Sequence, residues 1–481
     1  MNVFMLGWEF PPYISGGLGT ACYGLTRALD KLGTRVTFVL PRPVQPSATQ
    51  HVQIRAPDER TERMISEYAA ARRAGSGAAE FVGEEIPPPP GAGFRHTRFR
   101  AVDADIQPYA RPAGGAAPGV EPARATERIA ARAGVPTSTG AAVESAASVN
   151  AGLSLGDAPP PPRMQSIIDP GGHYSGDLFA EIGRYAHSAC AIATSEQFDL
   201  VHAHDWMTFP AGMAVSALTG KPLIVHVHST EFDRSGEHVN QRIYDIERAG
   251  MHAAGCVIAV SHFTRNLIVT RYGVPAAKVE VVHNAIDDNG PTLPKLLPIE
   301  RDERIVLFLG RITMQKGPEY FLYAAKRVLE IIENVRFVMA GTGDMIRRMI
   351  ELAAELGIGK KVLFTGFLRG DDLKRIYQMA DLYVMPSVSE PFGITPLEAL
   401  SHDVPVIISK QSGVSEILTH ALKVDFWDVD EMANKIVAVL RHPPLHNTLR
   451  DHGSIEVGRL SWADSAQRCV EIYELVHSRG G

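Results

Sequence analysis

The chain has 481 residues, of which 45% are hydrophobic and 21% charged, and its formal net charge is −6. A chain of this length is expected to form about three domains and can bury two full hydrophobic cores. The weak negative charge argues against nucleic acid or an anionic membrane as the main partner. The sequence contains no run of about 18 apolar residues, so we expect no transmembrane segment.

The cysteines and the N-terminus indicate a cytoplasmic protein. The cysteines show neither CxxC nor metal-like spacing and are Cys22, Cys190, Cys256 and Cys469. In a chain of this size they are typical of reduced core thiols. The first residues lack a basic segment and reach Glu9 and Pro11 too early for a signal peptide.

The chain begins with the repeating unit of a doubly wound sheet. Residues 2–7 predict a strand, and a glycine-rich loop follows it. Apolar residues then recur at three- and four-residue spacing as far as Gly33, which predicts a helix. Residues 35–40 predict the next strand, so the order is strand, loop, helix, strand.

Two segments, about 43–93 and 113–163, are rich in Ala, Pro, Gly, Ser and Arg. Such composition buries too little apolar surface to offset chain entropy, so we expect largely disordered insertions. A short helix is expected around 60–73. Between the insertions, residues 94–109 have the pattern of a strand or hairpin of the first domain.

Regular alternation of helix and strand returns near residue 175. Strands are expected at 198–205, 222–229, 256–261 and 279–284, and helices at 175–196, 208–218, 238–252 and 262–272. The apolar runs are continuous, as in strands covered on both faces. A proline-rich segment at 288–303 interrupts the pattern and predicts a linker.

A second alternating series begins after this linker. Its strands are expected at 304–311, 335–340, 361–366, 382–386, 404–408 and 421–425, and its last helices at 429–441, 445–459 and 462–478. The predicted fold is α/β, with two doubly wound, Rossmann-like domains facing each other across a cleft. We expect these domains at 1–287 and 304–460. Ligands of such sheets bind at the carboxyl ends of the strands.

The stretch SVSEPFGITPLEAL, residues 387–400, follows one of these strand ends. Glu390 lies in its loop, where neither packing nor capping requires a carboxylate. The pattern of Thr395, Pro396 and Glu398 is that of a capping box, with Thr395 as N-cap. Glu398 therefore has two interpretations: it caps the helix, or it also accepts hydrogen bonds from a ribose diol.

Cations and glycines follow two other strands. Gly16 to Gly19 open a helix, where backbone N–H groups can approach an anion. We favour this interpretation over a tight strand-to-helix turn. Arg311 and Lys316 follow the strand at 304–311 and can both reach a diphosphate leaving group. The alternative is that they are two surface cations.

Histidines end two consecutive strands: His202 and His204, followed by Asp205, and then His226 and His228. Period-two spacing puts each pair on one face. Metal ligands, packed core histidines and polar contacts to a sugar or its phosphate are the three interpretations. We favour sugar or acceptor contacts by His204, Asp205 and especially His228, and expect no metal site.

Neither of the two DxD pairs is expected to bind a metal. Asp103 and Asp105 lie beside an insertion, and Asp428 and Asp430 lie at a helix start.

Together these stretches resemble a retaining glycosyltransferase of the GT-B fold, closest to family 4 and to the glycogen and starch synthases. The resemblance covers most of the chain outside the insertions. It is carried by GWEFPPYISGGLGT, DLVHAHDW, HVHSTEFD, VSHFTRNLI, YGVPAAKVEVVHNAID, GRITMQKG, AGTGD, VLFTGFLRGDDLKRIYQMADLYVMPS and SEPFGITPLEAL.

The resemblance implies a donor site without metal or cofactor. It would hold the donor diphosphate by Gly16, Gly17, Arg311 and Lys316. It would hold the sugar by Glu390 and the backbone of Phe392, Gly393 and Ile394, the ribose by Glu398, and the base by the backbone of Phe367 and Leu368. His228 would touch the sugar near its 6-hydroxyl or the acceptor, and the helix at 461–481 would cross back to the first domain.

Two features separate the chain from bacterial glycogen synthases. Their first loop reads K-T-G-G-L, whereas residues 14–18 of this chain contain no lysine. Those enzymes lack the second glutamate of the E-x7-E pattern, which this chain has as Glu398. We expect an α-glucosyltransferase that uses a nucleotide sugar such as UDP- or ADP-glucose, with an α-glucan as candidate acceptor. The alternatives are a family 4 enzyme for another small-molecule, lipid or polysaccharide acceptor, a nucleotide-sugar epimerase, a phosphorylase, or a non-catalytic sugar-binding protein.

Overall fold

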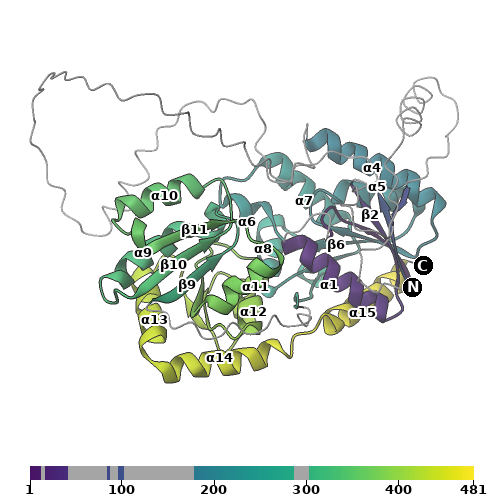
Figure 1. The fold of residues 1–481 in the computed structure, drawn as a ribbon. Coiled ribbons are helices and arrows are strands. Elements are labelled where there is room, and N and C mark those ends of the chain that lie inside the picture. Colours follow the sequence, from purple (N-terminus) through teal and green to yellow (C-terminus); the bar gives the residue numbers. More distant parts are fainter. Residues whose placement is uncertain (12–16, 42–83, 87–95, 102–177, 287–302, 481) are drawn as a thin grey trace, which may run out of the picture. The chain divides into compact units, whose positions relative to one another are not determined.

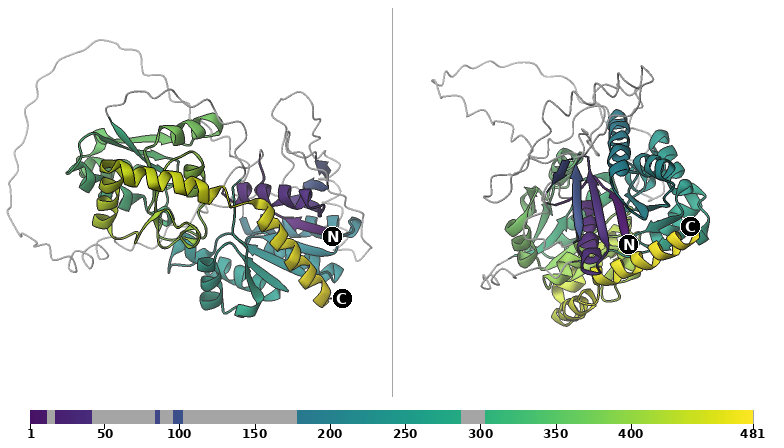
Figure 2. Two further views of the ribbon diagram at one scale, coloured as in Figure 1. Left: turned by 90° about the horizontal axis from the view of Figure 1, so that it is seen from below. Right: turned by 90° about the vertical axis from the view of Figure 1, so that its right-hand side faces the viewer.

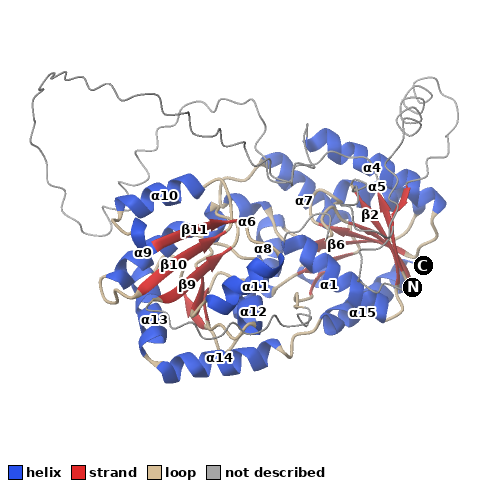
Figure 3. Ribbon diagram, in the orientation of Figure 1, coloured by secondary structure: helices blue, strands red, loops and turns tan. Residues whose placement is uncertain are grey.

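A computed structural model describes residues 1–11, 17–41, 84–86, 96–101, 178–286 and 303–480. By its internal contacts, the chain divides into one unit of Met1–Asp105 with Phe179–Gly481 and a second of Ile106–Leu178. The described elements belong to the first unit, apart from Leu178. They form two sheets, each flanked by helices (Figure 3).

The first sheet has eight strands in the order β3-β4-β2-β1-β5-β6-β7-β8. Its strands are β1 (Asn2–Leu6), β2 (Arg35–Leu40), β3 (Glu84–Ile86), β4 (Thr97–Ala101), β5 (Leu200–His204), β6 (Leu223–Val227), β7 (Cys256–Ala259) and β8 (Val279–Val281). All neighbours pair parallel except β3, which is antiparallel to β4. The helices that belong with this sheet are α1 (Gly17–Lys31), α4 (Leu178–Ser195), α5 (Phe209–Thr219), α6 (Glu231–Ser235), α7 (Gln241–Ala253) and α8 (His262–Tyr272).

The second sheet has six parallel strands in the order β11-β10-β9-β12-β13-β14. They are β9 (Arg304–Leu309), β10 (Val335–Ala340), β11 (Val362–Gly366), β12 (Leu382–Met385), β13 (Val406–Ser409) and β14 (Leu422–Val424). The remaining helices are α9 (Pro318–Leu329), α10 (Ile346–Glu355), α11 (Gly370–Met379), α12 (Ile394–Ser401), α13 (Val429–Arg441), α14 (Pro443–Val457) and α15 (Trp462–Gly480). Two doubly wound α/β sheets confirm the predicted fold class.

The strand order places the loops that carry candidate site residues. In a doubly wound sheet, ligands bind where the strand order reverses, outside the carboxyl ends of the two central strands. In the first sheet this point lies between β1 and β5, and in the second it lies between β9 and β12. Every residue of β5 and β6 is buried, as expected for strands covered on both faces.

The last helix, α15, packs against the first, α1 (Figure 1 and Figure 2). A Cβ added to Gly24 of α1 would lie 2.3 Å from the Trp462 ring, so the two helices touch where Gly24 has no side chain. Cys469 and Tyr473 of α15 are fully buried. Helix α15 therefore completes the core of the first sheet.

One part of the expected insertion at 43–93 proved to be ordered. Strand β4 is the strand expected within 94–109, and β3, which was not expected, extends the sheet by pairing antiparallel with β4. Edge pairing supplies backbone hydrogen bonds that composition does not reveal. The rest of both insertions, the helix expected around 60–73 and linker residues 288–302 lie outside the described residues.

Among the described helices, none combines the length and the apolar character needed to cross a bilayer.

Candidate functional site

Lys316 and Glu390 form an ion pair at the carboxyl ends of β9 and β12. Lys316 ends a 3-10 turn, Met314–Lys316, and Gly317 follows in the left-handed region at φ 63°. A Cβ on Gly317 would lie 2.1 Å from the carbonyl oxygen of Pro386, so only glycine lets the β9 loop approach β12 this closely. The pairing of these two predicted site residues depends on that approach.

The backbone of Glu390 is fixed on both sides. Its N–H donates to the Gln411 carbonyl at 3.0 Å, and its own carbonyl accepts from the Gly413 N–H at 3.0 Å. The carboxylate is 8% exposed and also accepts from the Ser387 hydroxyl at 3.2 Å. Ser387, Glu390, Lys316 and Thr395 line a cavity of about 10 Å³, enough for roughly one water-sized group.

The predicted capping box at the start of α12 was wrong. The helix begins at Ile394, and Gly393, at φ 103°, is the N-cap. Thr395 therefore lies inside the first turn, where its hydroxyl accepts from Tyr383 at 2.8 Å. Phe392 is 3% exposed, and its carbonyl accepts from the Val414 N–H at 2.7 Å. A left-handed glycine can replace a side-chain cap, which sequence spacing alone does not show.

Glu398 is held by a tyrosine instead. Its Oε2 accepts from the Tyr377 hydroxyl at 2.9 Å. Burial raises the pKa of Glu398, while the Tyr377 hydrogen bond acts in the opposite direction. The carboxylate thus has a structural partner, and its contact to a ribose stays a prediction.

The charge of Arg311 acts on Glu9, a buried acid that the sequence did not single out as a site residue. Its Nη2 is 3.5 Å from Oε1 of Gln315. Glu9, which is 4% exposed, accepts from the Gly19 N–H at 3.2 Å, and burial raises its pKa while the Arg311 charge opposes that shift. Glu9 thus connects the start of α1, through its hydrogen bond, with the charge of Arg311 in the loop after β9.

The two predicted phosphate-binding glycines lie at the start of α1. Gly17 is the first residue of this helix and is exposed, and Gly16 lies outside the described residues.

The four histidines of β5 and β6 lie together. His202 and His204 stack with ring centroids 4.3 Å apart, and His226 and His228 do the same at 4.3 Å. Nδ1 of His204 lies 2.9 Å from Nε2 of His228, so one of these nitrogens donates to the other. Burial lowers the pKa of His228 to about 3, which keeps this half-buried ring neutral at pH 7.

Asp205 joins the ends of β5 and β6. It is a non-glycine residue with a positive φ of 57°, and its Oδ1 accepts from the backbone N–H groups of His228 at 2.7 Å and Ser229 at 3.3 Å. Burial raises the pKa of Asp205 to about 7, opposed by the His228 N–H and by the charge of Arg234. Asp205 therefore positions the His228 backbone, and its contact to a sugar or acceptor stays a prediction.

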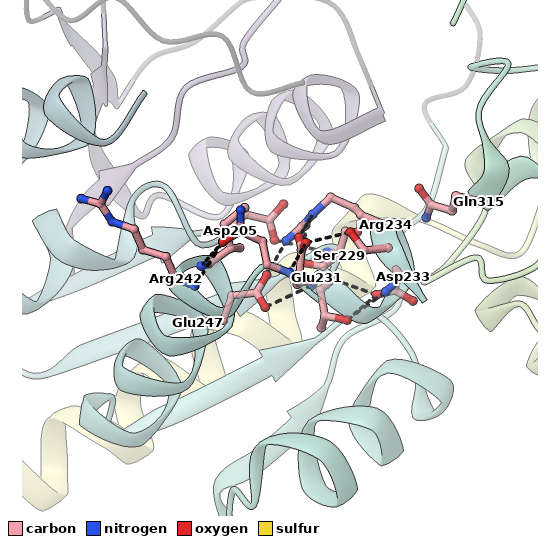
Figure 4. Close-up of polar contacts among 12 residues, drawn as sticks. Asp205, Ser229, Glu231, Asp233, Arg234, Arg242, Glu247 and Gln315 are labelled. Carbon is pink, nitrogen blue, oxygen red and sulfur yellow. Dashed lines mark hydrogen bonds and ion pairs between the residues drawn. The ribbon is translucent and has the colours of Figure 1, made fainter. Parts of the chain in front are cut away.

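A buried ionic network supports this loop (Figure 4). Arg234 donates to Oε1 of Glu247 at 2.5 Å, to Oε2 of Glu231 at 3.1 Å and to the Ser229 carbonyl at 3.3 Å. Glu247 also accepts from the Tyr272 hydroxyl. Helix α6 and this network were missed at the level of sequence.

A capping box starts α6, and its pattern could have revealed the helix. Asp233 Oδ2 accepts from the Thr230 N–H at 2.7 Å, while the Thr230 hydroxyl accepts from the Asp233 N–H. The spacing of Thr230 and Asp233 in STEFD is the signature of such a start.

The remaining predicted residues take varied positions. Phe367 is 53% exposed on the loop after β11, next to Leu368, and the Arg369 guanidinium lies 4.8 Å from the Phe367 ring centre. Asp428 caps α13 by accepting from the Glu431 N–H at 2.9 Å, so it lies at a helix start as expected. Asp103 and Asp105 lie outside the described residues.

Three family models match consecutive parts of the chain. Residues 2–75 match the starch synthase catalytic domain, 157–289 match Glycosyltransferase Family 4, and 291–454 match Glycosyl transferases group 1. An uncharacterized glycosyltransferase of Methanocaldococcus jannaschii is 32% identical over 298 residues, which cover 58% of this chain and 76% of that protein.

Two solved structures share the fold. Sucrose-phosphate synthase from Thermosynechococcus elongatus aligns with a TM-score of 0.64 at 18% identity over 99% of both chains. The catalytic domain of starch synthase IV from Arabidopsis thaliana, bound to ADP and acarbose, aligns with a TM-score of 0.63 at 15% identity over 99% of both chains. The chain therefore belongs to the glycosyltransferases and has their GT-B fold.

Proposed function

We propose that this enzyme transfers a hexose, with glucose as best candidate, from a nucleotide-diphosphate sugar to an acceptor hydroxyl with retention of the α-configuration. The observation that carries the proposal is the Lys316–Glu390 ion pair at the reversal point of the second sheet. A cation and a carboxylate at this place can serve the two halves of a donor, its diphosphate and its sugar hydroxyls.

In the proposed reaction the acceptor oxygen attacks the anomeric carbon as the bond from that carbon to the diphosphate oxygen breaks. The acceptor proton leaves with the diphosphate on the same face of the sugar. Negative charge develops on the leaving group, and Arg311 and Lys316 would stabilise it. Lys316 must then exchange its Glu390 partner for a phosphate, which frees the Glu390 carboxylate for sugar hydroxyls.

The remaining donor contacts are proposed from the resemblance to family 4 and to the glycogen and starch synthases. Gly16 and Gly17 would hold phosphate oxygens, Glu398 the ribose, and the backbone at Leu368 the base. The backbone of Phe392, Gly393 and Ile394 and the side chain of His228 would contact the sugar. Because the cavity of about 10 Å³ is far smaller than a hexose, donor binding requires the Lys316 side chain or the 387–393 loop to move.

An α-glucan is the proposed acceptor. Support comes from the match of residues 2–75 to a starch synthase domain and from a structural neighbour bound to ADP and acarbose. The sucrose-phosphate synthase neighbour favours a second candidate, a small phosphorylated sugar acceptor.

The test is a panel of UDP-, ADP- and GDP-hexoses, scored by nucleotide release with buffer, glycogen or a sugar phosphate. We expect release from one donor to depend on acceptor, and the anomeric proton coupling of the product to show an α-linkage. Conversion of a donor to its epimer without acceptor, or a β-linked product, would overturn the proposal.

A further inference from the structure

Three histidines of the first sheet form a buried triad that the proposed transfer reaction does not use. His202 and His204 lie on one face of β5, and His226 of β6 is the register partner of His204. All three are 0–1% exposed. The His226 ring centroid lies 5.4 Å from that of His202 and 5.1 Å from that of His204.

The ring nitrogens of this triad divide into two groups. Nδ1 of His202 lies 2.7 Å from the Tyr473 hydroxyl, and Nδ1 of His204 lies 2.9 Å from Nε2 of His228. Nε2 of His202, Nε2 of His204 and both nitrogens of His226 are buried and have no hydrogen-bond partner among the described residues. Buried polar atoms are normally paired, so four orphaned nitrogens in one cluster indicate a missing partner.

One nitrogen from each of the three rings lies within 4.8 Å of the other two. Nitrogens bound to one tetrahedral Zn²⁺ at about 2.0–2.1 Å lie roughly 3.4 Å apart. The three rings are stacked with interplanar angles of 27°, 5° and 28°, so they must rotate out of the stack to aim one nitrogen each at a single ion.

We propose that His202, His204 and His226 bind one divalent transition-metal ion, with Zn²⁺ as the best candidate. Imidazole nitrogen suits Zn²⁺ and neighbouring transition metals, whereas Mg²⁺ and Ca²⁺ prefer oxygen. Tyr473 and His228 then act as the outer partners that orient His202 and His204, as the second nitrogen of a metal-bound histidine usually requires.

A second, overlapping group is Cys22, His204 and His228. We favour the three-histidine triad because the other group would leave Nε2 of His202 and both nitrogens of His226 without partners. The bound ion would fasten β5 to β6 next to the turn that carries His228. This inference does not depend on the proposed transfer reaction.

The experiment is metal analysis of tag-free, full-length protein expressed with added Zn²⁺. We expect about one Zn²⁺ per chain after gel filtration, since a buried ion exchanges slowly. H226L and H202L should each lose at least nine-tenths of it. The exposed His187 provides the control, and H187Q should keep the wild-type content. Protein produced with Co²⁺ should show the visible bands of tetrahedral cobalt, and these should be missing in H226L.

H226L should fold, because leucine has about the volume of histidine and removes two orphaned nitrogens. Its melting temperature should equal or exceed that of metal-free wild type, whereas H202L also removes the partner of the buried Tyr473 hydroxyl and should melt at a lower temperature. The proposal is overturned by less than one-tenth equivalent of metal in the wild type. It is also overturned by metal that survives H226L and is lost in C22S, which would place the ion in the other group.

Discussion

The Ser389 hydroxyl donates a hydrogen bond of 2.5 Å to Oδ1 of Asp233, a residue 156 positions earlier in the chain. The other carboxylate oxygen of Asp233 caps helix α6. Ser389 is the neighbour of Glu390, and Pro391 accepts hydrogen bonds at its carbonyl from Ser261 at 2.6 Å and Thr264 at 3.2 Å. The loop that carries the predicted sugar-binding carboxylate is therefore held by residues of the first sheet's loops and helices.

This contact can be measured by a double-mutant cycle. S389A and D233N should each destabilise the protein, and their coupling energy in urea unfolding should be about 1–3 kcal/mol. S389A should also lower kcat/KM, since the Glu390 loop loses one support. The control is S478A, because the Ser478 hydroxyl donates only to the Leu475 carbonyl of its own helix. Additive effects of S389A and D233N would show that the contact contributes nothing.

Removing either member of the Lys316–Glu390 pair should abolish most transfer. K316A and E390Q are each expected to lower kcat/KM by about 100-fold or more, because a charged contact to the donor is lost. The matched control is K326A, whose ammonium is 43% exposed and pairs with Glu330 at 3.5 Å. Transfer near the wild-type rate by both K316A and E390Q, measured by nucleotide release, would refute the site assignment.

Arg234 should matter far more to stability than an exposed arginine. R234M leaves Glu247, 1% exposed, without its cation, so we expect a loss of about 3–5 kcal/mol in unfolding free energy. Adding E247Q should recover part of that loss. The comparison is R271M, which breaks the exposed pair with Glu237 and should cost about 0–1 kcal/mol. Equal losses in R234M and R271M would contradict the buried network.

Two glycines in helices should respond to alanine with opposite signs. G24A places a Cβ 2.3 Å from the Trp462 ring and should destabilise by about 1–3 kcal/mol. G183A meets nothing within 4 Å and should stabilise by about 0.5–1 kcal/mol, since alanine is the better helix former. Thermal unfolding measures both, and a neutral G24A would mean that α15 does not pack as described.

Glu416 should make stability depend on acid pH. Burial acts to raise its pKa, but hydrogen bonds from His283 and the N–H groups of His262 and Phe263 outweigh that effect, so the pKa lies below its usual value. A lowered folded-state pKa gives stability that is complete above about pH 4.5 and is lost as pH falls through the folded value. E416Q should flatten the urea-unfolding free energy of the protein between pH 6 and pH 3. An unchanged slope in E416Q would assign the acid sensitivity to other groups.

The strands and the loops after them were largely predictable from sequence. Continuous apolar runs such as those of β7 and β12 mark buried parallel strands, and residues after a strand face the ligand edge of the sheet. That reasoning placed Glu390 and Lys316 each after a strand. The structure adds that these strands are neighbours and that the two side chains pair.

Other features depend on contacts that sequence does not show. Thr395 has the spacing of an N-cap, yet the left-handed backbone of Gly393 starts α12 earlier. Arg234 and Glu247 are 13 residues apart on two helices, so no local pattern joins them. The hydrogen bonds that Asp205 accepts from the N–H groups of His228 and Ser229 join two strand ends that lie more than 20 residues apart, so no local pattern shows them.

The packing of α15 on α1 also affects how the protein is made. A ribosome releases the strands of the first sheet long before it has synthesised Trp462 and Tyr473, which are needed to bury Gly24 and His202. In the nascent chain, the face of α1 that α15 covers therefore stays exposed while more than a hundred further residues are translated. Apolar surface exposed for that long is what chaperones bind, so folding yield in the cell should depend on translation of the very last helix.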